Sequence, residues 1–155
     1  MQTLQDLKNL YKTDDDQWLE ETLKLLKNRQ FEQLDVENLI EELEELGREK
    51  KNAVASLLEK IIRHLLMYQY WTAERENNAN HWEAEIYSFK TQLNRLLTTN
   101  LTHYLQDNLE MIYQSSLKYV QKKTKLQNFP TQNPYSLKDL LDPDYLPSFW
   151  EEEQK

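Results

Sequence analysis

The sequence feature that most constrains the fold is the stretch from Asp35 to Trp71, which contains no proline and a single glycine, Gly47. Its apolar residues recur in alternating three- and four-residue steps, the spacing that places side chains along one face of an α-helix. This apolar seam consists of Val36, Ile40, Leu43, Gly47, Val54, Leu57, Ile61, Tyr68 and Trp71. The pattern predicts one long amphipathic helix over about 35–71, on which the rest of the chain is organised.

The start of this helix has a clear local signal. Asp35 is expected to accept the free amide hydrogens of the first turn, and Leu34 and Leu39 have the spacing of a hydrophobic staple. Gly47 costs about 1 kcal/mol relative to alanine in a helix interior. Because apolar residues continue on both sides of Gly47, we expect a continuous or gently bent helix.

Composition narrows the class of protein. The 155 residues include no cysteine, which excludes disulfides, thiolate metal sites and cysteine nucleophiles. A single glycine argues against phosphate-binding loops, and a formal charge of −8 makes nucleic acid an unlikely partner. The sequence shows neither a signal peptide nor a segment long enough to cross a membrane, so we expect a soluble, cytoplasmic protein.

The other apolar patterns predict an all-α antiparallel helical bundle. A short helix or docked arm at 3–11 is followed by a helix over about 14–28, opened by Thr13 and Asp16 with capping-box spacing. That helix is expected to fold back antiparallel on the first half of the long helix. Its apolar face carries Trp18, Leu19, Leu23, Leu25 and Leu26.

Beyond Trp71, the asparagine-rich run TAERENNAN predicts a turn, with Asn78 or Asn80 capping the next helix. A further helix is expected over about 101–126. All four prolines lie in the last 26 residues, so the domain prediction is a bundle over 1–128 and a C-terminal segment over 129–155, either packed on the bundle or partly flexible. Ser136 and Asp139 could start one more helical turn, and Tyr145, Leu146, Phe149 and Trp150 are candidate anchors.

Three segments together resemble one known family. They are LDVENLIEELEELGREKKNAVASLLEKIIRHLL, the tryptophan and isoleucine of HWEAEI, and the closing FPTQNPYSLKDLLDP. The chain resembles the family catalogued as domain of unknown function twenty-nine, small helical proteins common in cyanobacteria. The resemblance runs from LYKTDDDQWLE to LLDPDYLP. It implies an all-helical domain and no assigned activity.

His64 lies in the apolar seam, where a histidine is more often a hydrogen-bonded core residue than a ligand. The functional alternative joins it to His81 and Glu85, which are four residues apart on the next helix. In a hairpin turning near 75–76, both lie about one or two turns from His64. Two histidines and a carboxylate can hold a divalent metal or perform acid–base chemistry. No cofactor beyond this candidate metal is predicted.

Charge clusters favour structural interpretations. The sequence contains no E-x-x-H pair of the kind found in di-iron bundles, so the run Glu41–Glu45 is interpreted as a solvated face, with Glu44 paired to Arg48. Lysines near the end of the 101–126 helix are interpreted as complements to the helix dipole. A nucleic-acid surface using these lysines with Tyr113 and Tyr119 is the alternative.

Aromatic residues near the end of the long helix are the candidates for partner contact, because tyrosine and tryptophan are enriched at binding hot spots. They are Tyr70, Trp71 and Trp82, with core packing as the default interpretation. One slender helix covers Val36–Leu46, so apolar surface left there could support a homodimer. The leading hypothesis is a non-enzymatic protein-interaction or regulatory module. The alternative is a metal-dependent hydrolase or nuclease using His64, His81 and Glu85.

Overall fold

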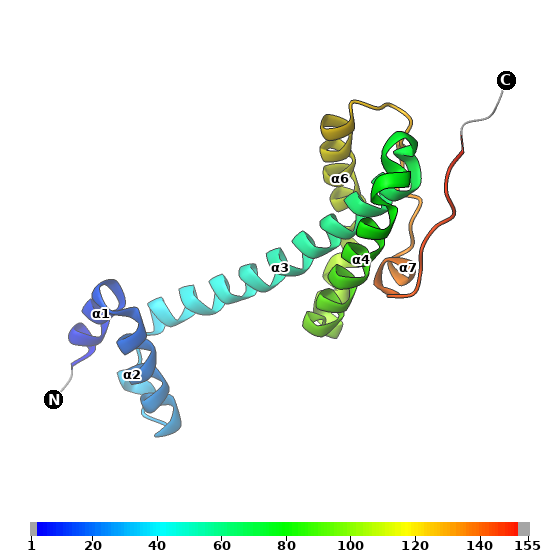
Figure 1. Cartoon of the computed structure of the whole chain (residues 1–155). Coiled ribbons are helices and arrows are strands. Elements are labelled where there is room, and N and C mark those ends of the chain that lie inside the picture. The colour runs from blue at the N-terminus through cyan, green and yellow to red at the C-terminus, as the bar shows by residue number, and fades with distance from the viewer. Residues whose placement is uncertain (1–2, 152–155) are drawn as a thin grey trace. The chain divides into compact units, whose positions relative to one another are not determined.

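The computed structural model describes residues 3–151, and this part of the chain contains helices and no strands (Figure 1). The elements are α1 (Leu4–Thr13), α2 (Asp15–Lys27), the 3-10 helix η1 (Phe31–Gln33), α3 (Val36–Tyr70), α4 (Thr72–Leu96), α5 (Thr99–Asp107), α6 (Leu109–Thr124) and α7 (Leu137–Leu141). The all-α prediction is confirmed. The chain forms two compact units, Met1–Glu49 and Lys50–Lys155, here called the N-terminal and C-terminal units.

Helix α3 is the long helix predicted from the apolar seam, and its 35 residues continue through Gly47 without a break. A Cβ added at Gly47 would meet no atom within 4 Å, so no neighbouring group requires a glycine there. The Asp35 side chain does not have the role expected of it. Its Oδ2 accepts hydrogen bonds from the side chains of Asn38 and Trp18 rather than from a backbone amide of the first turn.

The N-terminal unit is built from α1, α2, η1 and the first part of α3. Thr3 and Asp6 form a capping box at α1. The residue that caps α2 is Asp14, which accepts from the Gln17 amide at 3.1 Å, so the predicted Thr13–Asp16 box is wrong. The physical reason is that the Thr13 hydroxyl donates to the Asn9 carbonyl and therefore completes α1.

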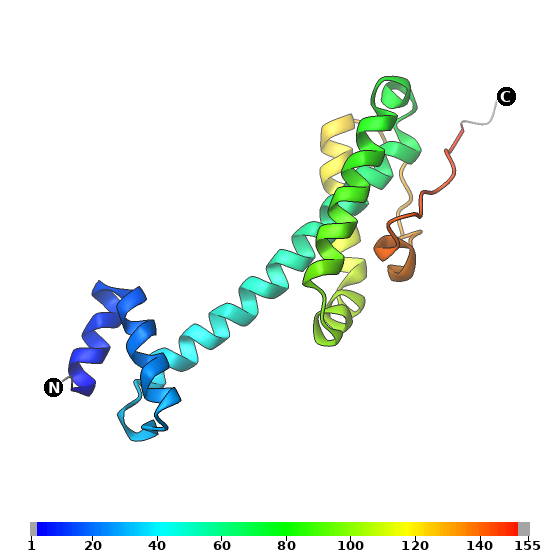
Figure 2. The same cartoon turned by 60° about the horizontal axis from the view of Figure 1, so that its bottom comes forward.

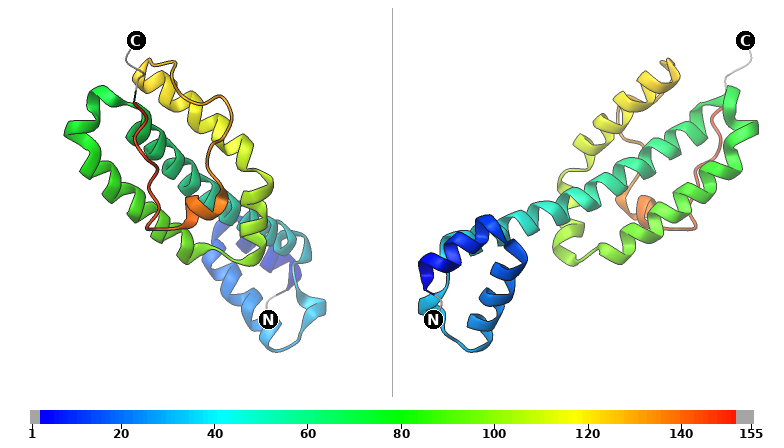
Figure 3. Two further views of the ribbon diagram at one scale, coloured as in Figure 1. Left: turned by 90° about the vertical axis from the view of Figure 1, so that its right-hand side faces the viewer. Right: turned by 60° about the vertical axis from the view of Figure 1, so that its left-hand side comes forward.

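The C-terminal unit is organised around the second half of α3, which packs against α4 and α6 (Figure 3, left). Its core is formed by buried apolar residues, which include Val54, Ile61 and Tyr68 of the predicted seam. On α3 these are Val54, Leu58, Ile61, Ile62, Leu65, Leu66, Met67, Tyr68 and Tyr70. The same core takes in Trp82, Ile86 and Leu93 of α4 and Ile112, Tyr113, Leu117 and Val120 of α6.

The predicted turn over TAERENNAN is wrong, because α4 begins at Thr72 and only Trp71 lies between α3 and α4 (Figure 2). The Arg75 side chain donates to the carbonyls of Tyr68 and Gln69 at this sharp turn and so satisfies two orphan acceptors at the end of α3. Residues of α3 and α4 nevertheless face each other in pairs whose midpoint is near 75–76. For example, the Tyr68 hydroxyl donates to Glu83 at 2.9 Å.

The predicted helix over 101–126 is interrupted, because α5 ends at Asp107 and α6 begins at Leu109. Asn108 separates them, and its side-chain amide donates to the Tyr104 carbonyl at 2.8 Å. Such bonds from asparagine to nearby backbone compete with helix hydrogen bonds. The apolar spacing concealed the break because Leu105, Leu109 and Ile112 remain on one face, and all three are buried.

The C-terminal segment contributes Phe129, Tyr135, Leu137 and Leu140 to the core of the C-terminal unit. Ser136 caps α7 by accepting from the Asp139 amide, as its spacing predicts. Past α7 the chain runs along the unit as an extended strap. Among its candidate anchors, Phe149 packs against Tyr68 and Arg75, and Trp150 against Tyr70. The Trp150 amide also donates to the Gln69 carbonyl.

Lys90 of α4 is a buried cation whose hydrogen bonds hold α7 and the start of the strap against α4. Its ammonium donates to the carbonyls of Asp139, Asp142 and Tyr145 at 3.0, 2.8 and 3.0 Å. The side chain is fully buried. Three carbonyl acceptors match the three donors of an ammonium group, so the charge is hydrogen-bonded although it is removed from water.

Candidate functional site

His64 lies on α3, half-buried, with its ring edge packed against Phe89 of α4 at 5.3 Å between ring centroids. Its Nδ1 is 2.7 Å from the Lys60 carbonyl. Because a carbonyl oxygen only accepts, Nδ1 carries the hydrogen of the neutral ring and Nε2 is the nitrogen left for a ligand. Burial lowers the pKa of His64, while the bond to Lys60 acts in the opposite direction. These contacts are those of a histidine that packs in a helical interface.

His81 and Glu85 lie on α4, close enough for Glu85 to raise and His81 to lower the pKa of His64. Within residues 3–151, however, no three histidine, aspartate or glutamate side chains come together in an arrangement that could hold a metal ion. The structure therefore brings the three candidates into the same region of the C-terminal unit without forming a ligand set. The metal or catalytic role of this cluster stays a prediction.

Two of the three aromatic candidates belong to the core. Tyr70 and Trp82 are buried, and Trp71 is half-buried with its ring stacked on Trp82 at 5.9 Å between centroids. A cavity of about 470 Å³ lies beside them. Its lining residues include Tyr70, Trp71, Leu126, Asn128 and Trp150. The role of this cluster in partner binding stays a prediction, and Trp71 is its most accessible member.

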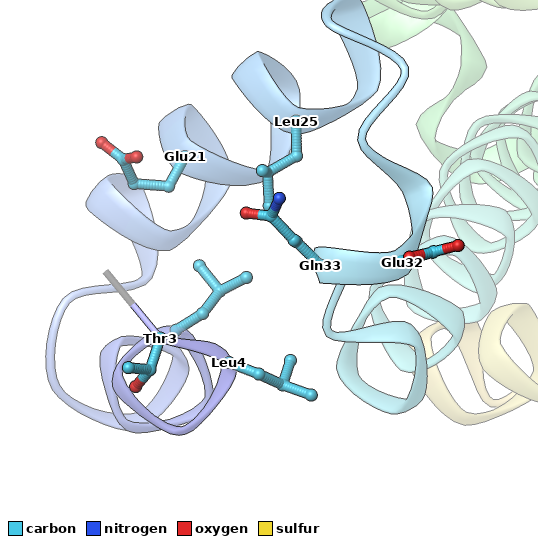
Figure 4. A pocket seen from close by; sticks show the side chains of 7 residues that line it. Thr3, Leu4, Glu21, Leu25, Glu32 and Gln33 are labelled. Carbon is cyan, nitrogen blue, oxygen red and sulfur yellow. The ribbon is translucent and has the colours of Figure 1, made fainter. Parts of the chain in front are cut away.

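A second cavity, of about 430 Å³, lies within the N-terminal unit. Figure 4 shows lining side chains contributed by α1, α2 and η1, among them Leu4, Leu25 and Gln33. Glu21 and Glu32 are the charged residues of its lining. Among residues 3–151 no basic side chain lines it, so its charged groups are acidic, beside the apolar leucines and the neutral polar Thr3 and Gln33.

The N-terminal unit leaves several large apolar side chains in contact with solvent. On α3, Val36, Ile40 and Leu43 are 51%, 51% and 60% exposed. The predicted apolar face of α2 is only partly covered, since Trp18 is buried whereas three leucines of that face are exposed. They are Leu19, Leu23 and Leu26. The interpretation of these leucines as packed against the long helix is therefore wrong.

The exposed row on α3 is not the side on which α2 and α1 pack. Within this unit, Trp18 reaches Asp35 and the Tyr11 hydroxyl donates to Glu42 at 2.8 Å. At 100° per residue, Glu42 and Asp35 lie on nearly the same side of the helix, roughly 100° or more from the centre of the Val36–Ile40–Leu43 row. The row is thus an unpartnered face of the N-terminal unit, here called the α3 apolar row.

A row of glutamates runs beside the α3 apolar row. Glu37, Glu41 and Glu44 are exposed, and none has a basic partner within residues 3–151. Arg48 pairs with Glu45 at 2.5 Å, so the predicted Glu44–Arg48 pair is wrong. The Glu41–Glu45 run is solvent-exposed, as interpreted from the sequence.

Charge is divided unevenly between the two units. Residues 1–49 contain six lysines or arginines and fourteen aspartates or glutamates, a formal charge of −8. Residues 50–155 contain thirteen of each and are formally neutral. This division is visible in the sequence and is the signal that could have directed attention to the N-terminal unit.

These features define an all-α protein with an acidic N-terminal unit that exposes an apolar helix face. The chain belongs to the family described as domain of unknown function DUF29, whose model matches residues 10–146. This match confirms the resemblance found in the sequence. No curated protein and no solved structure matches the chain. None of the helices in residues 3–151 has an apolar stretch that could cross a bilayer.

Proposed function

We propose that this protein is a non-enzymatic interaction module and that its N-terminal unit is the binding part. The observation that supports the proposal is the exposure of the α3 apolar row. Isolated exposed apolar residues are ordinary, but a contiguous exposed apolar row suggests an interaction surface. Val36, Ile40 and Leu43 follow one another at helical spacing, so they form such a row.

The same heptad pattern supports this interpretation along α3. In the C-terminal unit, the seam residues Val54 and Ile61 are buried in the core, where α4 and α6 cover α3. In the N-terminal unit, Ile40 stands in the same heptad register and is 51% exposed. The exposed row is apolar like a core face, but no other helix packs on it within residues 3–151. Such a face is suited to a partner that buries it on binding.

The proposal is tested by placing a photo-crosslinking amino acid at Leu43 of the full-length chain in its cell of origin. Met111 of α6 is a matched control position, because it is 62% exposed against 60% for Leu43 and lies in the neutral unit. We expect one discrete crosslinked partner from Leu43, lost on Ile40→Gln and absent from position 111. Equal labelling from both positions, or labelling that persists in Ile40→Gln, would refute the proposal.

A further inference from the structure

We propose that the ligand of the α3 apolar row is a basic amphipathic helix of a partner protein. This inference rests on the proposed function and specifies the chemistry of the partner. It combines two properties of the N-terminal unit, namely the geometry of the exposed row and the position of its unpaired negative charges.

The geometry favours a helix as the bound element. Val36, Ile40 and Leu43 are related as i, i+4 and i+7, and they extend over about 10 Å of helix at 1.5 Å per residue. Ridges of side chains with this spacing fit the grooves of a second helix. Gly47 continues the row by one more step, and a Cβ added to it would meet no atom within 4 Å. A partner helix can therefore come close to the backbone at this end of the row.

The charges favour a basic partner. Glu37, Glu41 and Glu44 are also related as i, i+4 and i+7, displaced by one residue from the apolar row. Along a helix, this displacement places the glutamates as a rim on one edge of the row. Lysine or arginine residues beside the apolar face of a docked helix would meet this rim, as e and g residues do in coiled coils.

A second copy of this chain is a poorer match. It would bring another unit of formal charge −8 against the first and would supply no surplus of cations to the rim. The same charge opposes docking on nucleic acid or on an anionic lipid surface. A basic helix is the occupant that satisfies both the apolar row and the glutamate rim.

The probe for the test is a synthetic peptide of about 21 residues with leucines at i, i+4 and i+7 spacing and lysines on both edges of that face. Its control replaces every lysine with glutamate. Binding to the full-length protein is measured by fluorescence anisotropy at low salt and at about 0.5 M NaCl. We expect the lysine peptide to bind at least about tenfold more tightly than the control, with the difference shrinking at high salt.

Two double variants locate the site. Ile40→Gln with Leu43→Gln should weaken binding of the lysine peptide at least about tenfold, whereas Met111→Gln should not change it. Glu41→Lys with Glu44→Lys should abolish the preference for the lysine peptide. The matched reversal in the neutral unit, Glu76→Lys with Asp107→Lys, should leave that preference intact. Far-UV circular dichroism verifies that each variant is helical.

Three results would overturn the inference: equal binding of both peptides, binding unaffected by the charge reversal at Glu41 and Glu44, or a homodimer in sedimentation velocity that Leu43→Gln dissociates. In the last case the row binds a second copy. If Leu43 crosslinks to a partner in cells while the lysine peptide fails to bind, the interaction function stands and only the basic helix is excluded.

Discussion

The indole Nε1 of Trp18 donates a hydrogen bond to Oδ2 of Asp35 at 3.2 Å, and each of these side chains is only 1% exposed. The bond joins α2 to the first residue before α3, so it fixes how the helices of the N-terminal unit meet. The second oxygen of Asp35 has no hydrogen-bond partner. The unit thus holds a buried carboxylate that is only partly satisfied, and the Trp18 bond is one of the two that compensate it.

Replacing Asp35 with alanine should destabilise the N-terminal unit by about 2 kcal/mol, because the buried Trp18 N–H loses its acceptor. Trp18 is the only tryptophan in residues 1–49, so its indole N–H resonance during urea unfolding reports on this unit. Glu20→Ala on the exposed side of α2 is the control and should change stability by less than about 0.5 kcal/mol. Equal effects of the two substitutions would show that the buried bond contributes nothing.

Lys90 gives the C-terminal unit a dependence on alkaline pH. Burial lowers the pKa of Lys90 from 10.5 to about 8, against the opposing influence of Asp142 and Asp139. Between these two values the unfolded chain holds a proton that the folded chain has released. Unfolding then takes up a proton, so stability should rise with pH from about 8 toward 10.

The measurement is urea unfolding of the full chain at several pH values in that interval, compared with Lys90→Met. The variant should be less stable by about 3 kcal/mol or more, since three buried carbonyls lose their donor, and its stability should lack the rise. The measured pH interval ends near 10 because tyrosines also affect stability at higher pH. Burial raises the pKa of Tyr113, so only the unfolded chain releases that proton there. Parallel pH profiles for the two proteins would contradict the prediction.

Protein purified without chelator should hold well under one transition-metal ion per chain. His64 directs its Nδ1 hydrogen to Lys60, and no three-ligand group forms within residues 3–151. Stable protein sites for zinc usually need three or four ligands. Elemental analysis measures the metal content of the wild-type chain and of His64→Ala, and His103→Ala on α5 is the matched control. Stoichiometric metal that is lost in His64→Ala and retained in His103→Ala would revive the hydrolase or nuclease hypothesis.

Local patterns allowed the main features of the fold to be predicted, and the failures arise at individual side-chain hydrogen bonds that apolar spacing does not encode. The seam from Val36 to Trp71 predicted α3 because apolar spacing is encoded residue by residue. The segment 72–80 was mistaken for a turn because its asparagines favour turns. The structure makes this segment helical, and its Arg75 bonds to the end of α3, which no sequence pattern reveals. Lys90 gave no signal either, since its acceptors lie 49 to 55 residues further on.

The candidate site was predictable only in part. The sequence identified Val36–Leu46 as apolar surface that one helix could not cover, and the structure exposes Val36, Ile40, Leu43 and Leu46 there. It also predicted that the leucines of α2 would be packed, which the structure contradicts. The seam spacing is the same at Ile40, which is exposed, and at Ile61, which is buried, so periodicity alone cannot tell an open face from a covered one. The charge balance of residues 1–49 is a further signal in the sequence that distinguishes the two ends of α3.

That distinction leads to a prediction about two leucines on the same helix. Leu58 is fully buried in the C-terminal unit, whereas Leu43 is 60% exposed in the N-terminal unit. Leu58→Ala should cost about 2–5 kcal/mol in urea unfolding, because it opens a cavity in a packed core. Leu43→Ala should cost less than about 0.5 kcal/mol in the isolated protein, since it removes no buried contact and alanine is a good helix former. If Leu43→Ala destabilised the isolated chain as much as Leu58→Ala, another part of the same protein would already cover the α3 apolar row, and no surface would remain there for a partner.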